Sequence, residues 1–350
     1  MISVLINLVL FAIILTIIVG VHEFGHFIFA KIAGVYVYEF AIGMGPKIWG
    51  KKIGETEYSL RAIPIGGYCQ LAGEDLDVDD TNKVPKNKRL QNKSAWQRFL
   101  IMVFGPMNNF ILAILILLMM AFIWGGTTMK PVITSVSPES AAASAGLRDG
   151  DRVLEINNKK ISTSDDLSLY LAIAGKKGAT FKVERTDGSV DSVKVKPKKI
   201  ENDGKESYVY GISMKGEKTK GFLNAFVYTY KKTVSIFKQM FITVGYLFTG
   251  RISLNQLSGP VGIYSVVGET RTSGFANILY LMAFLSINVG FINLLPIPAF
   301  DGGHILFIII ELIKGSPVNP EIENKIHTVF LLLLLGLMLI ITFNDILRLF

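Results

Sequence analysis

The sequence is nearly free of cysteine, because Cys69 is the only one among 350 residues. A single thiol cannot form a disulfide within the chain, and it cannot provide the cysteine-rich ligand sets of structural zinc sites. The composition therefore excludes both a disulfide framework and a cysteine-based zinc site.

Basic residues are absent from the N-terminal region. No Lys or Arg precedes Lys31, and no A-x-A pattern follows the first apolar run. A cleaved secretory signal peptide is expected to have both a basic start and such a cleavage site. We therefore expect the first apolar run to be retained as a membrane span.

Apolar residues, in contrast, are abundant: they make up 50% of the chain, and the mean hydropathy is +0.44. A helix needs about 20 apolar residues to cross the hydrocarbon core of a bilayer. The stretches that can do so are Ile2–Ala30, Phe99–Trp124, Ile278–Ile310 and Val329–Phe343, the third being interrupted by Asn293, Pro296 and Pro298. The sequence predicts a polytopic α-helical membrane protein with about four core transmembrane helices.

Two regions between these spans have other patterns. Tyr36–Met44 and Glu57–Gln70 alternate apolar and polar residues and contain several glycines, which predicts strands with turns. After the second span, short strand and helix patterns predict a small α+β domain. We expect a first membrane region at 1–125, the α+β domain at 126–216, an amphipathic linker and helical region at 217–275, and a second membrane region at 276–350.

The formal net charge is +8. Such a charge is compatible with nucleic-acid binding, but basic residues in a membrane protein more often mark cytoplasmic loops. The loop between the first two spans is rich in them, with Lys51, Lys52, Lys83, Lys86, Lys88, Arg89, Lys93 and Arg98. We expect this loop to be cytoplasmic, the segment from about Gly125 to Asn277 to be extracytoplasmic, and nucleic acid not to be a partner.

The segment His22-Glu23-Phe24-Gly25-His26 is an H-E-x-x-H motif inside the first apolar run. Two histidines four residues apart lie on one helix face and can bind one zinc ion, and the glutamate between them can take a proton from water. Histidines in apolar helices can also be ordinary hydrogen-bonded core residues. Two of them beside a carboxylate in a membrane span are costly unless paired or liganded, which favours a Zn2+ site.

A catalytic zinc ion needs a third protein ligand. Asp301 follows Pro296 and Pro298, which cannot continue a helix, and unwound backbone at membrane depth is tolerated only inside protein or beside a wet cavity. His304, one turn further on, is a rival ligand, but a carboxylate at a helix start is better placed to turn inward. His327 lies in a short polar loop and is expected to have no special role.

Asn293 is a second polar residue in the interrupted span. It can satisfy backbone groups freed by the prolines, or it can hydrogen-bond the substrate carbonyl or the oxyanion formed from it. The sequence alone does not decide between these two roles.

In these motifs the chain resembles the site-2 protease family of intramembrane metalloproteases, in particular the bacterial branch that cleaves anti-sigma factors. The matching pieces run in order over nearly the whole chain: HEFGH at 22–26, FGPMNN at 104–109, GPVGI at 259–263 and NLLPIPAFDGGH at 293–304. The resemblance implies that His22, His26 and Asp301 are zinc ligands, that Glu23 activates water and that Asn293 is catalytic. Phe300 replaces the family's usual leucine, another apolar residue.

The family resemblance also extends to the two regions between spans. The strand-rich stretch from Tyr36 to Gln70 corresponds to a membrane-associated β-hairpin whose edge receives an extended substrate. Gly66 and Gly67 would there permit close approach of the substrate backbone, although ordinary turns explain these glycines equally well.

The inserted domain resembles a circularly permuted PDZ domain, most clearly at residues 137–151. In PDZ domains an apolar-Gly-apolar loop binds a peptide C-terminus, and Tyr210, Gly211 and Ile212 match that loop. Alternatively, the domain excludes substrates that carry bulky outer domains. We favour exclusion, because it needs no specific side chains.

The sequence thus predicts a zinc endopeptidase, multi-pass in a bacterial plasma membrane, that cleaves the transmembrane helices of single-span proteins such as anti-sigma factors or signal-peptide remnants. One alternative is a membrane zinc protease that trims soluble or prenylated substrates, for which Glu311 is the only acidic residue near the third-ligand position. Another is a membrane-tethered adaptor with a vestigial metal site. The intact Glu23 counts against the adaptor.

Overall fold

The structure is a computed structural model that describes residues 2–74, 84–202, 205–250 and 257–347. The chain divides into two compact units, Met1–Leu117 with Leu254–Phe350, and Leu118–Ser253. The domain boundaries at 125, 216 and 275 stay predictions, and residues 251–256 of the expected linker region lie outside the described residues.

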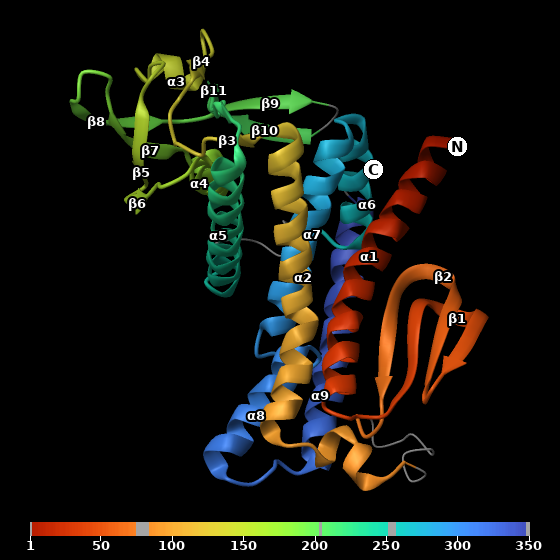
Figure 1. Cartoon of the computed structure of the whole chain (residues 1–350). Helices are drawn as coiled ribbons and strands as arrows, with labels where there is room; N and C mark the ends of the chain where they lie inside the picture. The colour runs from red at the N-terminus through yellow and green to blue at the C-terminus, as the bar shows by residue number, and fades with distance from the viewer. Residues whose placement is uncertain (1, 75–83, 203–204, 251–256, 348–350) are drawn as a thin grey trace. The chain divides into compact units, whose positions relative to one another are not determined.

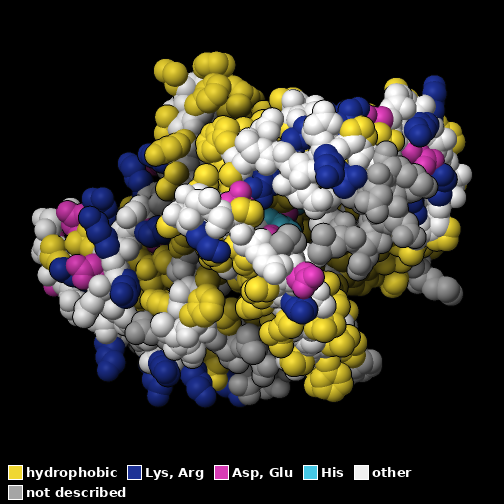
Figure 2. Space-filling model, turned by 90° about the horizontal axis from the view of Figure 1, so that it is seen from below, with side chains coloured by type: hydrophobic (Ala, Val, Ile, Leu, Met, Phe, Trp, Pro, Cys, Tyr) yellow, Lys and Arg dark blue, Asp and Glu magenta, His cyan; other side chains and the backbone are white. Residues whose placement is uncertain are grey.

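The described part of the chain contains four helices that are long and apolar enough to cross a membrane, as the sequence predicts. They are α1 (Ile2–Ile32), α2 (Ala95–Trp124), α7 (Phe275–Leu294) and α9 (Pro320–Leu347). Large apolar side chains are exposed over much of these helices, and Figure 2 shows apolar side chains exposed on one face of the molecule. Such surfaces are matched by lipid rather than by water.

The interrupted third stretch folds as two helices rather than as one broken span. α7 ends at Leu294, and six residues, 295–300, separate it from α8 (Asp301–Lys314). Pro296 and Pro298 lie between them, and proline both lacks an N–H donor and disfavours the helical conformation in the residue before it. The break therefore places Asp301 at the first position of a new helix.

In the first unit, α1 lies between the β-hairpin and other membrane helices (Figure 1). On one side, Phe11, Ile14 and Ile18 pack with residues of α7 and of α6 (Pro260–Thr272). Toward its C-terminal end, Ala30 packs with Ile101 of α2 and with residues of the β-hairpin. These contacts lie before and after the H-E-x-x-H motif along α1.

Two long antiparallel strands, β1 (Val37–Ile53) and β2 (Thr56–Leu71), form a bent hairpin beside α1 (Figure 1). The bend lets β1 pair twice: Ala41 pairs with Ser59 and also with Tyr68. The last part of β2, residues 67–71, is thereby an edge of the hairpin sheet, and β2 runs along α1. Two short 3-10 helices, η2 (Lys86–Lys88) and η3 (Leu90–Asn92), precede α2.

The second unit begins with the last turns of α2 and contains a small α+β fold, as predicted. A four-stranded antiparallel sheet in the order β6-β5-β7-β8 covers a core that includes Leu167, Phe181 and Val183. The elements are β3 (Gly126–Thr127), β4 (Ser135–Val136), α3 (Ala141–Ser144), β5 (Arg152–Ile156), β6 (Lys159–Lys160), α4 (Ser164–Ala174), η4 (Gly175–Lys177), β7 (Ala179–Glu184), β8 (Val190–Val195), β9 (Lys198–Asn202), β10 (Lys205–Val209), β11 (Ile212–Ser213), β12 (Lys218–Thr219) and α5 (Phe222–Phe248). Ion pairs from Lys232 and Lys238 of α5 to Asp165 and Asp166 attach α5 to the start of α4.

Candidate metal centre

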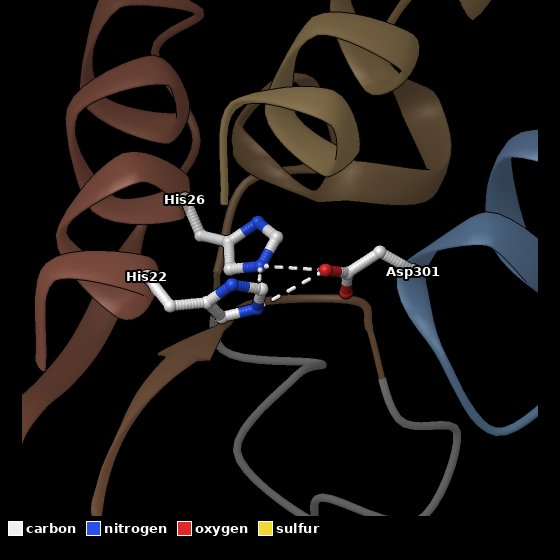
Figure 3. Close-up of side chains that lie close together, drawn as sticks. All are labelled: His22, His26 and Asp301. Carbon is white, nitrogen blue, oxygen red and sulfur yellow. Dashed lines mark hydrogen bonds and ion pairs between the residues drawn. The ribbon is translucent and has the colours of Figure 1, made fainter. Parts of the chain in front are cut away.

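His22 and His26 lie one turn apart on the same face of α1, and both are buried (Figure 3). Their Nε2 atoms are 3.2 Å apart. Residues at i and i+4 of a helix are neighbours on its surface, so the spacing in the sequence is sufficient to bring the two imidazoles together.

Asp301 reaches the same point from α8 (Figure 3). Its Oδ2 atom is 3.1 Å from His22 Nε2 and 3.4 Å from His26 Nε2. Its side chain is 18% exposed, so the cluster has limited access to solvent. The structure thus brings together the three residues that the sequence suggests as ligands. Asp301 lies 275 residues after His26 in the chain.

The outer nitrogens of the two imidazoles have partners of their own. His26 Nδ1 donates to the carbonyl oxygen of Ile101 in α2, at 2.8 Å. The amide of Asn109, also in α2 and fully buried, lies 3.3 Å from His22 Nδ1. We assign the amide orientation in which Asn109 Oδ1 accepts the Nδ1 hydrogen, because this gives a partner to an oxygen that otherwise has none among the described residues. Both histidines then carry their hydrogen on Nδ1.

This assignment leaves three lone pairs directed at one point, on His22 Nε2, His26 Nε2 and Asp301 Oδ2. Asp301 Oδ2 is buried and has no hydrogen-bond donor in the part of the chain that the structure describes. Three buried acceptors at 3.1–3.4 Å repel one another unless a cation lies between them. Tetrahedral zinc with bonds of about 2.0–2.2 Å separates its ligand atoms by about 3.3–3.6 Å, so the residues present fit a zinc ion.

Close packing of α2 against α1 contributes to this geometry. A Cβ atom added at Gly105 would lie 2.2 Å from His26 Nε2, far inside van der Waals contact. Only glycine therefore lets α2 pass beside the imidazole while Ile101 and Asn109 reach the two histidines. Gly105 belongs to the FGPMNN segment at 104–109.

Glu23 lies between the two histidines in sequence, and its carboxylate is held by the β-hairpin. Its Oε2 atom accepts the backbone N–H of Cys69, at 3.0 Å. Cys69 pairs with Phe40 on its other side, so this N–H belongs to the outer edge of β2. The edge of the hairpin and the carboxylate of Glu23 are thus in direct contact.

Asn293 lies in the last turn of α7 and is half-buried. Within the described residues, no hydrogen bond joins its side chain to His22, His26 or Asp301. Its position at the end of α7 and the start of the break is compatible with both roles that the sequence leaves open.

The remaining predicted site residues lie in the hairpin and in the second unit. Gly66 has a φ of +78°, and a Cβ atom at Gly67 would lie 2.5 Å from the carbonyl oxygen of Ala41, so both positions require glycine for the hairpin itself. The Tyr210 side chain is buried in the core of the second unit, where its ring packs edge-on against Phe181. Gly211 has a φ of +78°, and Ile212 pairs with Val136 in β4.

Both rivals for the third-ligand position have other partners. Glu311 forms an ion pair with Arg98 of α2, at 2.5 Å. His304 Nδ1 lies 3.4 Å from Glu323 Oε1, and its ring stacks on that of His327. The prediction that His327 lies in a loop is wrong, because α9 begins at Pro320 and includes it. His304 and Glu323 line a hollow of about 130 Å³ in the first unit. Figure 2 shows a histidine side chain at the bottom of a hollow, with charged side chains around it.

Four contributors to the centre were not identified as such from the sequence: Gly105, Asn109, the carbonyl oxygen of Ile101 and the backbone N–H of Cys69. Asn109 lies in a motif that the sequence analysis noted, but its role depends on how α2 packs on α1. Cys69 and Ile101 contribute backbone groups, so neither residue type signals its contact.

Comparisons with known proteins identify the family of this chain. The model of peptidase family M50 matches residues 10–337. The protein named regulator of sigma-W protease RasP of Bacillus subtilis (strain 168) is 31% identical over 419 residues, which cover 98% of this chain and 99% of the relative. A predicted zinc metalloprotease of Clostridium perfringens is 37% identical over 93% of this chain and 94% of the relative. A predicted zinc metalloprotease of Staphylococcus aureus (strain MSSA476) is 32% identical over 99% of this chain and 100% of the relative.

Proposed function

The chain belongs to peptidase family M50 and is a multi-pass membrane zinc metalloprotease, and from this premise we propose that His22, His26 and Asp301 hold the zinc ion while Glu23 is the general base. The observation that carries this proposal is the convergence of three acceptor atoms at 3.1–3.4 Å with no donor among the described residues to separate them.

We further propose that the enzyme cleaves peptide bonds inside the bilayer. His26 and His22 lie six and ten residues before the end of α1 at Ile32. At 1.5 Å per residue this is about 9 and 15 Å along the helix, within the depth of the hydrocarbon core. A substrate that reaches this depth is most simply a transmembrane helix.

When bound, zinc would polarise the substrate carbonyl and lower the pKa of a water molecule. Glu23 takes the proton of the attacking water and then delivers it to the leaving amine nitrogen. Asn109 and the Ile101 carbonyl keep the two imidazoles in the tautomer that leaves Nε2 free. Asn293 is proposed to stabilise the oxyanion that forms on the substrate carbonyl.

A transmembrane helix hides its peptide bonds in its own hydrogen bonds, so it has to unwind before attack. The outer edge of β2 can supply replacement hydrogen bonds by strand addition. The contact between Cys69 N–H and Glu23 supports this proposal, because a peptide paired with residues 67–71 would lie beside the general base. Gly66 and Gly67 would permit close approach of the substrate backbone at the start of this edge.

The proposed substrates are single-span membrane proteins already trimmed outside the membrane, such as anti-sigma factors or signal-peptide remnants. The name of the Bacillus subtilis relative connects that protein with sigma-W and supports the first class. We propose that the domain between α2 and α7 is extracytoplasmic and PDZ-like, and that it excludes substrates with bulky outer domains. A peptide-binding role for Tyr210, Gly211 and Ile212 is the alternative.

The basic residues of the loop between α1 and α2 support a cytoplasmic position for that loop. The metal centre, near the end of α1 that leads into this loop, would then lie toward the cytoplasmic side of a bacterial plasma membrane.

The test pairs zinc content with cleavage of a transmembrane helix. The full-length protein and its Glu23→Gln variant are purified in detergent and mixed with a fusion protein that carries one transmembrane helix. We expect about one zinc ion per chain in both proteins, product only from the native protein, and no product after chelation. Equal cleavage by Glu23→Gln would refute the assigned base. Cleavage of a soluble unfolded chain, with every transmembrane helix left intact, would refute the intramembrane substrate.

A further inference from the structure

The break between α7 and α8, residues 295–300, sets the direction of Asp301. Each backbone N–H group within the break has a partner. Pro296 and Pro298 have no N–H. The other donors within residues 295–300 that bond to backbone carbonyls are those of Leu295, Ile297 and Phe300. The last donor, the N–H of Ala299, bonds instead to a side chain, His327 Nδ1 of α9, at 3.3 Å. A residue of another helix, α9, thus accepts the one backbone N–H of the break that has no backbone partner.

Ala299 also has an unusual backbone conformation. Its φ is +101°, beyond the left-handed region at about +50 to +70° that some non-glycine residues adopt. A non-glycine residue stays in such a conformation only when its surroundings hold it there. The bond to His327 acts on this residue, two positions before Asp301.

The His327 ring is itself held in place. It stacks on the His304 ring with a centroid distance of 4.1 Å, and it contacts Phe307 of α8. Glu323 lies one turn earlier in α9, with Oε1 3.9 Å from His327 Nε2 and 3.4 Å from His304 Nδ1. The side chain of His327 is 15% exposed, so its ring is largely enclosed by these groups.

We propose that His327 is a positioning residue for the zinc site: its Nδ1 accepts the Ala299 N–H and holds the break in the conformation that turns Asp301 toward His22 and His26. This inference rests on the proposed role of Asp301 as a ligand. It assigns to α9 a part in the metal centre, although α9 supplies none of the three proposed ligands.

His304, Glu323 and His327 also have the composition of a second metal site. The geometry favours positioning. A neutral imidazole that accepts at Nδ1 carries its hydrogen on Nε2, and that nitrogen then has no lone pair for a metal. Nearly parallel rings, 20° apart, also direct their nitrogens side by side rather than toward one ion.

Two amide substitutions separate the roles of the two ring nitrogens. In His327→Asn the side-chain oxygen can occupy the place of Nδ1, whereas in His327→Gln the amide lies near the place of Nε2. The double variant His327→Gln/Ala299→Gly tests the strain directly, since glycine adopts positive φ at little cost. Thr328→Val, the next position of α9, is the matched control, because the Thr328 hydroxyl donates to the carbonyl oxygen of Asn324 in its own helix.

The measurement is zinc release from the full-length protein in detergent under excess chelator, together with the visible spectrum of the cobalt-substituted protein. We expect release from His327→Gln to be about tenfold faster than from the native protein, at the lower end of the effect of outer partners on metal sites. His327→Asn and Thr328→Val should stay within about threefold of native, and the double variant should recover most of the loss. The cobalt spectrum should change in His327→Gln alone.

Zinc release from His327→Gln at the rate of the native protein, with rapid zinc release from Asp301→Ala, would overturn the positioning role and leave the proposed zinc site standing. Two zinc ions per native chain, one of them lost in both His327→Asn and Glu323→Gln, would overturn it in favour of a second metal site. Absence of zinc from the folded native protein would instead refute the proposed zinc site itself.

Discussion

Replacing Gly105 by alanine introduces one methyl group at the closest approach of α2 to the zinc site. The new Cβ would lie 2.2 Å from His26 Nε2 and 2.5 Å from Cε1, whereas ordinary contact begins near 3.4 Å. The imidazole therefore has to move by about 1.2 Å, while metal–ligand distances in proteins tolerate about 0.2 Å. We expect His26 to leave the metal and zinc affinity to fall at least about 100-fold.

The fold should survive this change. Rotation of the His26 ring breaks its bond to the Ile101 carbonyl, which costs about 1 kcal/mol. Alanine in place of glycine inside a helix stabilises the fold by about 0.5–1 kcal/mol. The free energy of unfolding should therefore change little, and the loss of zinc should be separable from misfolding.

The assay is zinc retention against a competing chelator, with thermal unfolding of the apoprotein as the measure of fold. Gly336→Ala is the matched control, because Gly336 also lies in a membrane helix and a Cβ there meets no atom within 4 Å. A Gly105→Ala variant that binds zinc as tightly as the Gly336→Ala variant would refute the packing argument and the assignment of His26.

Three further predictions follow from contacts around the site. Asn109→Leu removes the partner of His22 Nδ1 and should weaken zinc binding about tenfold in the same chelator assay; unchanged binding would contradict the tautomer that we assign. Asp345 Oδ2 accepts the N–H groups of Gly259 and Gly262 at the start of α6, so Asp345→Asn should cost about 1–2 kcal/mol of unfolding free energy, measured by thermal or denaturant unfolding; an unchanged stability would show that the charge is not needed there. Burial raises the pKa of Glu39, but hydrogen bonds from Ser59, Arg61 and Tyr68 outweigh it and lower the pKa below the ordinary 4.5. A lowered pKa stabilises the fold above pH 4.5, and this stability is lost as the pH falls through the folded-state pKa. Glu39→Gln should therefore flatten the decline of Tm below pH 4.5. An unaltered decline would contradict the role of Glu39.

The sequence was informative where chemistry follows from local spacing. His22 and His26 lie four residues apart in a helix, so their convergence is a property of the helix itself. The four spans follow from apolar length, and the break before Asp301 follows from two prolines.

The contributions of α2 could not be predicted in the same way. Gly105 and Asn109 act through close packing of two helices that are some 80 residues apart in sequence. A glycine in a membrane helix has many possible reasons, and only the position of the His26 ring shows which one applies here. The spacing along α2 does place Ile101, Gly105 and Asn109 on one face, but it does not identify the helix that this face meets.

The break between α7 and α8 shows a related limit. Proline predicts that the helix ends, but not that the following residues form a separate helix with Asp301 at its start. Nor does the sequence identify His327 as the partner of Ala299, because the polar residues around it predict a loop in which a histidine most often has no special role. Backbone conformation at Ala299 and the path of α9 determine that contact.

The most direct test of the central claim is X-ray absorption spectroscopy at the zinc edge, on the full-length protein in detergent. The account predicts about four nitrogen or oxygen ligands near 2.0–2.2 Å, two of them with the outer-shell scattering of imidazole rings. In Asp301→Ala the two imidazoles should remain and the oxygen contribution should change. A sulfur ligand near 2.3 Å, or a native spectrum unaffected by Asp301→Ala, would contradict the proposed site.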